Sequence, residues 1–317
     1  MFDNKPGMFH LLRSSRVSAG QLPVQSLRFQ PWTGGIRVSD CVQLSTSSVH
    51  QGDTKNFLKG NSPETYAKYY VDLNLKRKEL LESPSRFQKI SEREEHSDIP
   101  LLTSRKFSIG KNLVQHFGVI CMKGPLDIVI YEQLFGLVQP QTVFELGSLF
   151  GGSAISIANT LTTQGAKGHV YSIDLDLSLL DPRVPELKPD NLTFIQGDMY
   201  KIEEVLPQGT LERLPHPWVV IEDAHANSFG VLEHFHKFMK EGDYIVFDDT
   251  DPETPLMNGM GLDNRYPLYE PWGYNKLHTL KKFMNKYSDF YCVDSYLTDM
   301  FGYNATNNWN GYIRRMK

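Results

Sequence analysis

Short runs of consecutive apolar residues alternate with amphipathic segments through the second half of the chain. The apolar runs predict strands at 142–146, 170–173, 192–195, 218–221 and 244–247, with final strands at 290–296 and 310–314. Apolar residues at helical spacing predict helices at 126–138, 153–162, 228–240 and 274–286. Buried strands that alternate with helices indicate a mostly parallel sheet with helices on both faces. We therefore predict an α/β, Rossmann-like fold.

The first 125 residues follow a different pattern. Residues 1–60 have little periodicity and many turn-forming residues, which predicts an irregular N-terminal arm. Ser62-Pro63-Glu64 predicts a helix start, because serine is a common N-cap and proline is favoured at the first helical position. The expected organisation is an arm at 1–60, a helical N-terminal extension at 61–125 and one α/β domain at 126–317.

Composition narrows the class of protein. The chain has 317 residues, a net charge of -4 and three scattered cysteines, which indicates neither a nucleic-acid partner nor a disulfide framework. No apolar run approaches the roughly 18 residues that a membrane helix needs. We therefore expect a cytoplasmic protein without a membrane partner. The stretch 4–38 is basic and lacks acidic residues, so a loosely packed arm and an organellar transit peptide stay open as interpretations.

A glycine-rich loop follows the first strand of the predicted sheet. Glycines allow the backbone to turn sharply and to approach a ligand closely, and the amides of the next helix can receive an anionic group. The spacing is neither that of a P-loop nor a clean dinucleotide fingerprint, so a plain tight turn stays open. The candidate ligand-binding residues are Glu145, Gly147, Gly151, Gly152 and Ser153.

Two further acids lie just beyond predicted strands. Asp174 is placed to accept hydrogen bonds from a ribose diol, as acids do in nucleoside-binding doubly wound sheets. An exposed acid at a strand end is the alternative for this residue. Asp198 could accept a hydrogen bond from an adenine amino group, or it could cap the next helix. Together with the glycine loop, these acids favour nucleoside binding.

The fourth and fifth strands are each followed by acidic residues. Asp223 follows one strand, and Asp248 and Asp249 follow the next. Unpaired carboxylates at adjacent strand ends are costly unless a cation or a shared proton compensates them, and oxygen ligands suit Mg²⁺, Mn²⁺ or Ca²⁺. Helix caps are the alternative. His225 is a candidate general base, because imidazole titrates near neutral pH, with a buried structural histidine as the alternative.

The order of these motifs resembles the cephalosporin hydroxylase family. That family has a class I methyltransferase fold and is similar to macrolide-sugar and rhamnosyl O-methyltransferases. The resemblance covers roughly residues 105–317 and is most specific between Ile221 and Asp249. Phe117-Gly118, with Lys123, Pro125 and Asp127, looks like the family's lead-in helix, and residues 311–315 look like its closing strand.

The resemblance implies two ligands. The glycine loop would hold the methionine portion of S-adenosylmethionine, and Asp174 would bind its ribose. Asp223, Asp248 and Asp249 would bind a divalent metal, with Mg²⁺ first and Mn²⁺ or Fe²⁺ as alternatives. The first of the paired acids is often glutamate in the family, and here it is aspartate.

The function implied is a metal-dependent O-methyltransferase of natural-product biosynthesis. Its substrate would be a hydroxyl of a small metabolite such as a sugar or a polyketide, with Asp223 and His225 in catalytic roles and His225 as the base. The Asp-to-His spacing differs among relatives. A hydroxylation or methoxylation component and a non-catalytic S-adenosylmethionine-binding protein are the alternatives. An iron oxygenase is disfavoured, because its facial triad would need a second histidine.

Two expectations concern partners. The family implies a homo-oligomer in addition to a small hydroxylated acceptor. The segment 251–274 is rich in proline, glycine and aromatic residues, which is typical of a substrate-binding loop beside a site. A surface loop packed by its own aromatics and an oligomer contact stay open for that segment.

Overall fold

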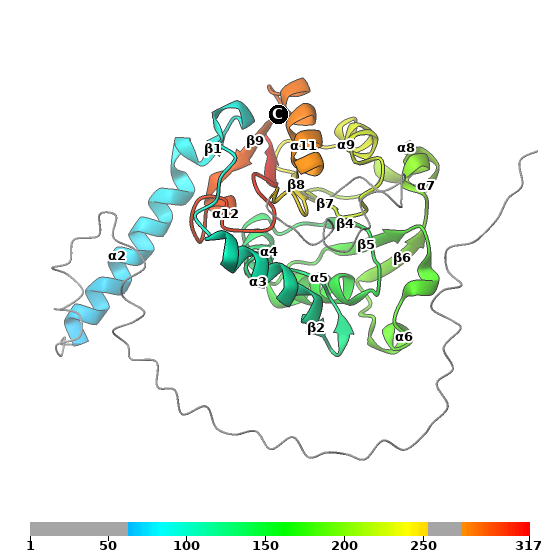
Figure 1. The fold of residues 1–317 in the computed structure, drawn as a ribbon, viewed down its shortest axis with the longest axis horizontal. Helices are drawn as coiled ribbons and strands as arrows, with labels where there is room; N and C mark the ends of the chain where they lie inside the picture. Colours follow the sequence, from blue (N-terminus) through cyan, green and yellow to red (C-terminus); the bar gives the residue numbers. More distant parts are fainter. Residues whose placement is uncertain (1–62, 253–273) are drawn as a thin grey trace, which may run out of the picture. The chain divides into compact units, whose positions relative to one another are not determined.

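An eight-stranded sheet forms the centre of the computed structural model, in the strand order β1-β9-β10-β8-β7-β4-β5-β6 (Figure 1). The structure describes residues 63–252 and 274–317. Within them, Ala67–Lys317 form one compact unit, which contains the whole sheet. The predicted arm at 1–60, the Ser62 cap and most of the segment 251–274 lie outside the described residues.

Five neighbouring strands of this sheet run parallel to one another. They are β4 (Thr142–Leu146), β5 (His169–Asp174), β6 (Leu192–Gln196), β7 (Trp218–Glu222) and β8 (Tyr244–Phe247). Strand β10 (Tyr312–Arg315) lies antiparallel between β8 and β9 (Tyr291–Asp294), and β1 (Phe87–Gln88) pairs with the outer side of β9. The prediction of a mostly parallel Rossmann-like sheet is confirmed, and the predicted bounds of β4 to β8 agree with the observed ones within one residue, whereas β1 was not predicted.

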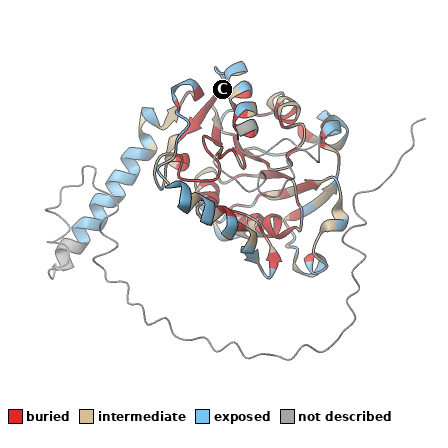
Figure 2. Ribbon diagram, viewed as in Figure 1, coloured by how far each residue is buried: buried red, intermediate tan, exposed pale blue. Residues whose placement is uncertain are grey.

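Both faces of the sheet are covered, which explains why its central strands contain runs of consecutive apolar residues. Every residue of β4, β7 and β8 is buried (Figure 2). In β8, Ile245 and Phe247 belong to one hydrophobic cluster, and Tyr244 and Val246 belong to the cluster on the other face. Successive side chains of a strand point to opposite faces, so a strand buried on both sides loses the alternating polar pattern.

The helices divide between these two faces. Residues of α7, α9 and α11 pack in the first cluster, and residues of α4, α5 and α6 pack in the second.

The α-helices are α2 (Pro63–Glu82), α3 (Leu101–Gly110), α4 (Pro125–Val138), α5 (Gly152–Thr163), α6 (Val184–Leu187), α7 (Ile202–Val205), α8 (Gln208–Leu211), α9 (Ser228–His236), α11 (Tyr274–Lys286) and α12 (Ser295–Thr298). Short 3-10 helices are η3 (Pro84–Arg86), η4 (Ile90–Glu92), η5 (Lys111–Leu113), η6 (Leu177–Leu179) and η7 (Met199–Lys201). Among the described residues, none of these helices has the length and apolar character of a membrane span.

The region before the parallel strands is more closely joined to the sheet than its composition indicated. Strand β1 belongs to the main sheet, although it lies in the segment 61–125 that we predicted to be a helical extension. The predicted boundaries after residues 60 and 125 stay a prediction. Phe117 and Gly118 do not belong to a helix: both have positive φ, 51° and 81°, and form the turn of a hairpin of β2 (Gln115–His116) and β3 (Val119–Ile120). Two central residues with positive φ are typical of a tight hairpin turn, so the helix assigned to this pair is wrong.

Candidate metal and cofactor site

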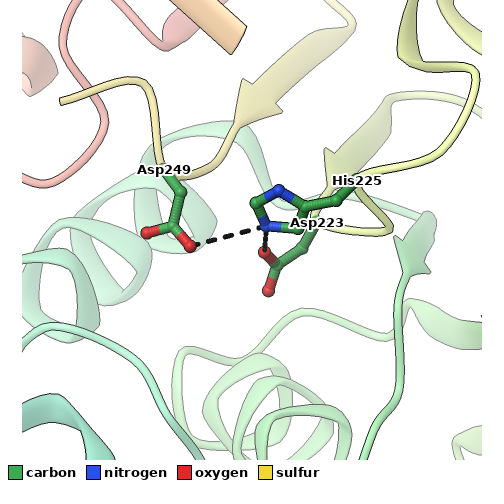
Figure 3. A group of neighbouring side chains, drawn as sticks. All are labelled: Asp223, His225 and Asp249. Carbon is green, nitrogen blue, oxygen red and sulfur yellow. Dashed lines mark ion pairs between the residues drawn. The ribbon is translucent and has the colours of Figure 1, made fainter. Parts of the chain in front are cut away.

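Three predicted site residues meet where two parallel strands end. Asp223 and His225 follow β7, and Asp249 follows β8, the neighbouring strand. His225 Nε2 lies 3.4 Å from Asp223 Oδ1 and 3.6 Å from Asp249 Oδ2 (Figure 3). The atoms with which they could bind a metal all lie within 4.8 Å of one another, so the group could hold a metal ion. The structure thus brings together Asp223, His225 and Asp249 at the sheet edge where the sequence predicted a site.

The backbone at this edge is unusual for residues other than glycine. His225 has φ 53° and Asp249 has φ 56°, both in the left-handed region. That conformation costs roughly 1–2 kcal/mol for a residue with a Cβ, so surrounding contacts must hold it. One such contact is visible: the Asp249 amide donates a 2.9 Å hydrogen bond to Asn308 Oδ1. Strained residues of this kind often lie at functional sites.

Each of the two carboxylates is also bound by a buried lysine. Lys111 Nζ lies 2.6 Å from Asp249 Oδ1, and Lys123 Nζ lies 2.6 Å from Asp223 Oδ2. Both lysine side chains are less than one-tenth exposed. Each carboxylate therefore gives one oxygen to a lysine and turns its other oxygen toward His225 Nε2.

These ion pairs keep the carboxylates ionised although both side chains are partly buried. Burial by itself would raise the pKa of Asp249, but Lys111 and His225 outweigh it and hold that pKa well below its usual range. Burial likewise opposes ionisation of Asp223, and Lys123 and His225 lower its pKa overall. Burial would lower the pKa of Lys123, but the neighbouring acids raise it well above normal. The site therefore holds fixed charges of both signs.

The structure does not place Asp248 with the three candidate metal ligands Asp223, His225 and Asp249. Its buried carboxylate accepts hydrogen bonds from Tyr131 Oη at 2.9 Å and from Asn308 Nδ2 at 2.6 Å. It also contacts Lys123 Nζ closely. Burial raises the pKa of Asp248, although Lys123 opposes this effect. The sequence placed Asp248 beside Asp249 as an equivalent ligand, but the two carboxylates have different partners.

The glycine loop lies against the same edge, and its glycines have identifiable packing reasons. At Gly147, with φ 105°, a Cβ would lie 2.7 Å from the backbone oxygen of Asp223. At Gly152, a Cβ would overlap the backbone oxygen of Ile120. Gly151, with φ 85°, is the N-cap of α5 and would meet the side chain of Leu180. The loop is therefore a tightly packed strand-to-helix turn that also fixes the position of Asp223.

The remaining predicted cofactor residues have partners within the protein. Asp174 Oδ2 accepts 2.8 Å hydrogen bonds from the amides of Ser148 and Leu149, which holds the glycine loop. Asp198 accepts a hydrogen bond from the Tyr200 amide and caps η7, as the capping alternative predicted. Whether either acid also binds a nucleoside stays a prediction.

The last two predicted cofactor residues lie on either side of the glycine loop. Glu145 is fully buried at the end of β4 and accepts a 2.5 Å hydrogen bond from Ser172 Oγ. Burial raises the pKa of Glu145 to about 7, against the opposing effect of Lys123. Ser153 is buried in the first turn of α5. Their roles toward a cofactor stay a prediction.

Sequence reasoning missed the cations of the site. Lys123 lies 100 positions before Asp223, and Lys111 lies 138 positions before Asp249. In the sequence, Lys123 stands out only as part of a family-like stretch, and Lys111 does not stand out at all. A single lysine in a segment of mixed composition carries no local signal, so only the fold reveals these pairs.

Comparison with known proteins identifies the family. The family model described as rhamnosyl O-methyltransferase/CmcI matches residues 110–316. The chain belongs to this family. The resemblance inferred from the motif order is thereby confirmed, and the match includes every residue of the acidic site and the glycine loop.

Individual members of the family are distant in sequence. The chain is 24% identical over 204 residues to the rhamnosyl O-methyltransferases of Mycobacterium tuberculosis (strain H37Rv) and Mycobacterium bovis (strain BCG), which covers 63% of this chain and 77% of theirs. It is 23% identical over 212 residues to that of Mycobacterium leprae, covering 64% and 84%.

Two solved structures of the family resemble the fold. The CmcI-N160 apo structure gives a TM-score of 0.49 at 24% identity and covers 65% of this chain and 77% of its own. The structure titled cmcI-D160 Mg-SAM gives a TM-score of 0.47 at 24% identity and covers 65% and 78%.

Proposed function

We propose that this chain is a metal-dependent, S-adenosylmethionine-dependent O-methyltransferase that acts on a hydroxyl of a small metabolite, such as a sugar. The single observation that carries the proposal is the convergence of Asp223 Oδ1, His225 Nε2 and Asp249 Oδ2 beside the glycine loop. In open α/β sheets, ligands bind at the carboxyl ends of the strands, where these residues lie. Membership in a family of O-methyltransferases supports the reaction type.

The donor set suits a hard divalent cation. Asp223 and Asp249 each offer one carboxylate oxygen that no lysine contacts among the described residues, and oxygen ligands are those that Mg²⁺ prefers. Imidazole is a better ligand for transition metals than for Mg²⁺. We therefore assign Asp223 and Asp249 as Mg²⁺ ligands and keep His225 as the base. When bound, the ion would act as a Lewis acid toward an acceptor oxygen.

The cofactor would bind at the neighbouring glycine loop. The first turn of α5 offers its amides, including that of Ser153, to the carboxylate of a methionine group. Asp174 and Asp198 lie at the ends of β5 and β6 on the same edge of the sheet, where ribose and adenine would lie. When bound, S-adenosylmethionine would supply the methyl group.

The protein's own residues would then perform two tasks. His225 Nε2 would accept the proton of the acceptor hydroxyl as the oxygen gains the methyl group. The lysine-held carboxylates would keep the acceptor in line with the methyl group, and such positioning of two reactants can account for much of the acceleration. Membership in the rhamnosyl O-methyltransferase/CmcI family supports a sugar hydroxyl as the acceptor.

Two alternatives are less well supported. An oxidative role would favour a facial triad of two histidines and one carboxylate, whereas the group has one histidine and two carboxylates. A protein that only binds S-adenosylmethionine would not need His225 held against two ionised carboxylates, with two lysines fixing their orientation. A hydroxylase and a protein that only binds S-adenosylmethionine both differ from the proposal in that neither expects methyl transfer to an acceptor hydroxyl.

The test combines calorimetry with turnover. S-adenosylmethionine is titrated into metal-free and Mg²⁺-loaded protein, and labelled methyl transfer is measured over a panel of hydroxylated acceptors with and without chelator. The variants are Asp249→Ala and Asp223→Ala. Glu203→Ala serves as the matched control, since Glu203 is an exposed acid whose partner is Lys237.

We expect both site variants to bind S-adenosylmethionine but to lose Mg²⁺ binding and metal-dependent turnover, and the control to keep all three. Full activity of either site variant in the presence of chelator would refute the metal assignment. No cofactor binding by any sample would refute the methyltransferase proposal as a whole. Cofactor binding without turnover on any acceptor would favour the non-catalytic alternative.

A further inference from the structure

Lys123 occupies a central place among the acids at the ends of β7 and β8. It precedes α4, and its Nζ lies 2.6 Å from Asp223 Oδ2 and in close contact with Asp248 Oδ2. The Lys123 side chain is only 7% exposed. An ammonium group between two carboxylates compensates their repulsion, as a metal ion would.

The Asp248 carboxylate accepts hydrogen bonds from residues in three separate parts of the chain. Tyr131 on α4 donates to both of its oxygens, at 2.9 and 3.0 Å. Asn308, in the loop before β10, donates to Oδ1 at 2.6 Å, and Lys123 donates to Oδ2. A carboxylate has about four acceptor sites, so little capacity is left for a metal. The Asp248 side chain is also only 4% exposed.

The contact with Lys123 distinguishes the two carboxylate oxygens of Asp223. Lys123 contacts Oδ2 of Asp223, and the other oxygen, Oδ1, is the one that faces His225 Nε2. The orientation of Asp223 therefore depends on where the lysine ammonium is held. The residue that holds it on the opposite side is Asp248.

We propose that Lys123 is a positioning residue that turns Asp223 Oδ1 toward the metal, and that Asp248 acts through Lys123 instead of serving as a metal ligand. This inference deepens the proposed function and rests on it. It divides the two adjacent acids into different roles: Asp249 contacts the metal, and Asp248 anchors the lysine.

The roles proposed for Lys123 and Asp248 can be distinguished by how much metal affinity falls when each residue is removed. Removing a partner that orients a metal ligand typically costs about 10- to 100-fold in metal affinity. If Asp248 acts only through Lys123, removing both should cost little more than removing one, because residues of one network are not additive. A direct ligand would instead add its own loss.

The experiment is a double-mutant cycle read by Mn²⁺ alone. Free Mn²⁺ is measured by electron paramagnetic resonance during titration of the wild type, Lys123→Met, Asp248→Asn, the double variant and Asp249→Ala. The dissociation constant of S-adenosylmethionine and the thermal unfolding of each protein are measured in parallel. Arg86→Met is the matched control, because it breaks another shielded ion pair, with Asp294, at the β1–β9 edge of the sheet.

We expect Lys123→Met and Asp248→Asn each to weaken Mn²⁺ binding by about 10-fold or more, and the double variant to match the singles within about threefold. Cofactor affinity and the Mn²⁺ affinity of Arg86→Met should stay at the wild-type value. Unchanged or tighter Mn²⁺ binding by Lys123→Met would overturn the proposal, because it would mean that the lysine only competes with the metal. Losses that add in the double variant would overturn it as well.

A milder variant covers the case in which Lys123→Met or Asp248→Asn does not fold. Tyr131→Phe removes one donor to Asp248 and keeps the ring, and we expect weaker Mn²⁺ binding with an unchanged KM for the cofactor and a lower kcat. Wild-type Mn²⁺ affinity in this variant would then overturn the proposal. Failure of the proposed function looks different: the wild type itself would bind no Mn²⁺ that Mg²⁺ displaces.

Discussion

Gly147 gives the sharpest test of how the glycine loop serves the acidic site. Its φ is 105°, and a Cβ at this position would lie 2.7 Å from the backbone oxygen of Asp223 and 2.9 Å from its carbonyl carbon. Both contacts are with backbone, which cannot rotate away as a side chain would. Gly147→Ala should therefore displace Asp223, the first residue of the proposed metal site.

The expected effect of Gly147→Ala has two components, the strain of a positive φ and the displacement of the Asp223 carbonyl. A positive φ costs an alanine roughly 1–2 kcal/mol of folding stability. The Asp223 carbonyl must also retreat by about 0.7 Å to reach an ordinary contact of 3.4 Å, and such overpacking costs about 1–3 kcal/mol more. A shift of 1 Å at a catalytic group can reduce the rate by about 100-fold, so we expect a loss of kcat of at least about tenfold.

Gly151→Ala is the matched control for this variant. It also forces an alanine into positive φ, 85°, but its Cβ would press on the side chains of Leu180, Val184 and Phe194. Urea unfolding and Mn²⁺ titration of both variants separate the two terms. Both should lose stability, and only Gly147→Ala should bind Mn²⁺ about tenfold more weakly.

Equal Mn²⁺ affinity in the two glycine variants would refute the reasoning, because the contact with Asp223 would then have no consequence for the site. Weakened cofactor binding in both variants would not affect this conclusion. Both glycines lie in the loop that we propose binds S-adenosylmethionine.

Two further predictions concern folding stability. Burial raises the pKa of Asp127 to about 6, so the contribution of Asp127 to stability should be largest below about pH 4 and fall by about 3 kcal/mol as the pH rises from 4 to 6. Urea unfolding of Asp127→Asn should lack this part of the pH dependence, and an unchanged pH dependence would refute it. Lys276→Met should cost about 3–5 kcal/mol, because it breaks a fully buried 2.8 Å ion pair with Glu222. The double variant Lys276→Met/Glu222→Leu should recover most of that loss in urea unfolding, and a double variant no more stable than the single one would contradict this prediction.

The sheet could be predicted from sequence because its signal is local. Each parallel strand is a short apolar run, and burial on both faces is what makes the run continuous. The helix at 126–138 was equally legible, since Pro125 starts α4 and Gln139, with φ 50°, ends it before Pro140. The short strands β1, β2 and β3 have two residues each, too few for any periodicity.

The acidic site could be predicted only in part, and the limit lies at Asp248 and Asp249. Two adjacent acids after a strand look equivalent in the sequence. Side chains of successive residues point in opposite directions along an extended chain, and the left-handed φ of Asp249 turns the backbone further. Consequently Asp249 faces His225, whereas Asp248 contacts Tyr131 and Asn308.

The charges of the site show why an acidic cluster alone is weak evidence for a metal. The sequence predicts a cation at Asp223, Asp248 and Asp249, because like charges repel. In the structure, Lys111 and Lys123 already supply two positive charges to these three carboxylates. Charge repulsion therefore cannot by itself demand a divalent ion. The metal assignment depends instead on direction: the lysines contact one oxygen each of Asp223 and Asp249, and the other two oxygens face His225 Nε2.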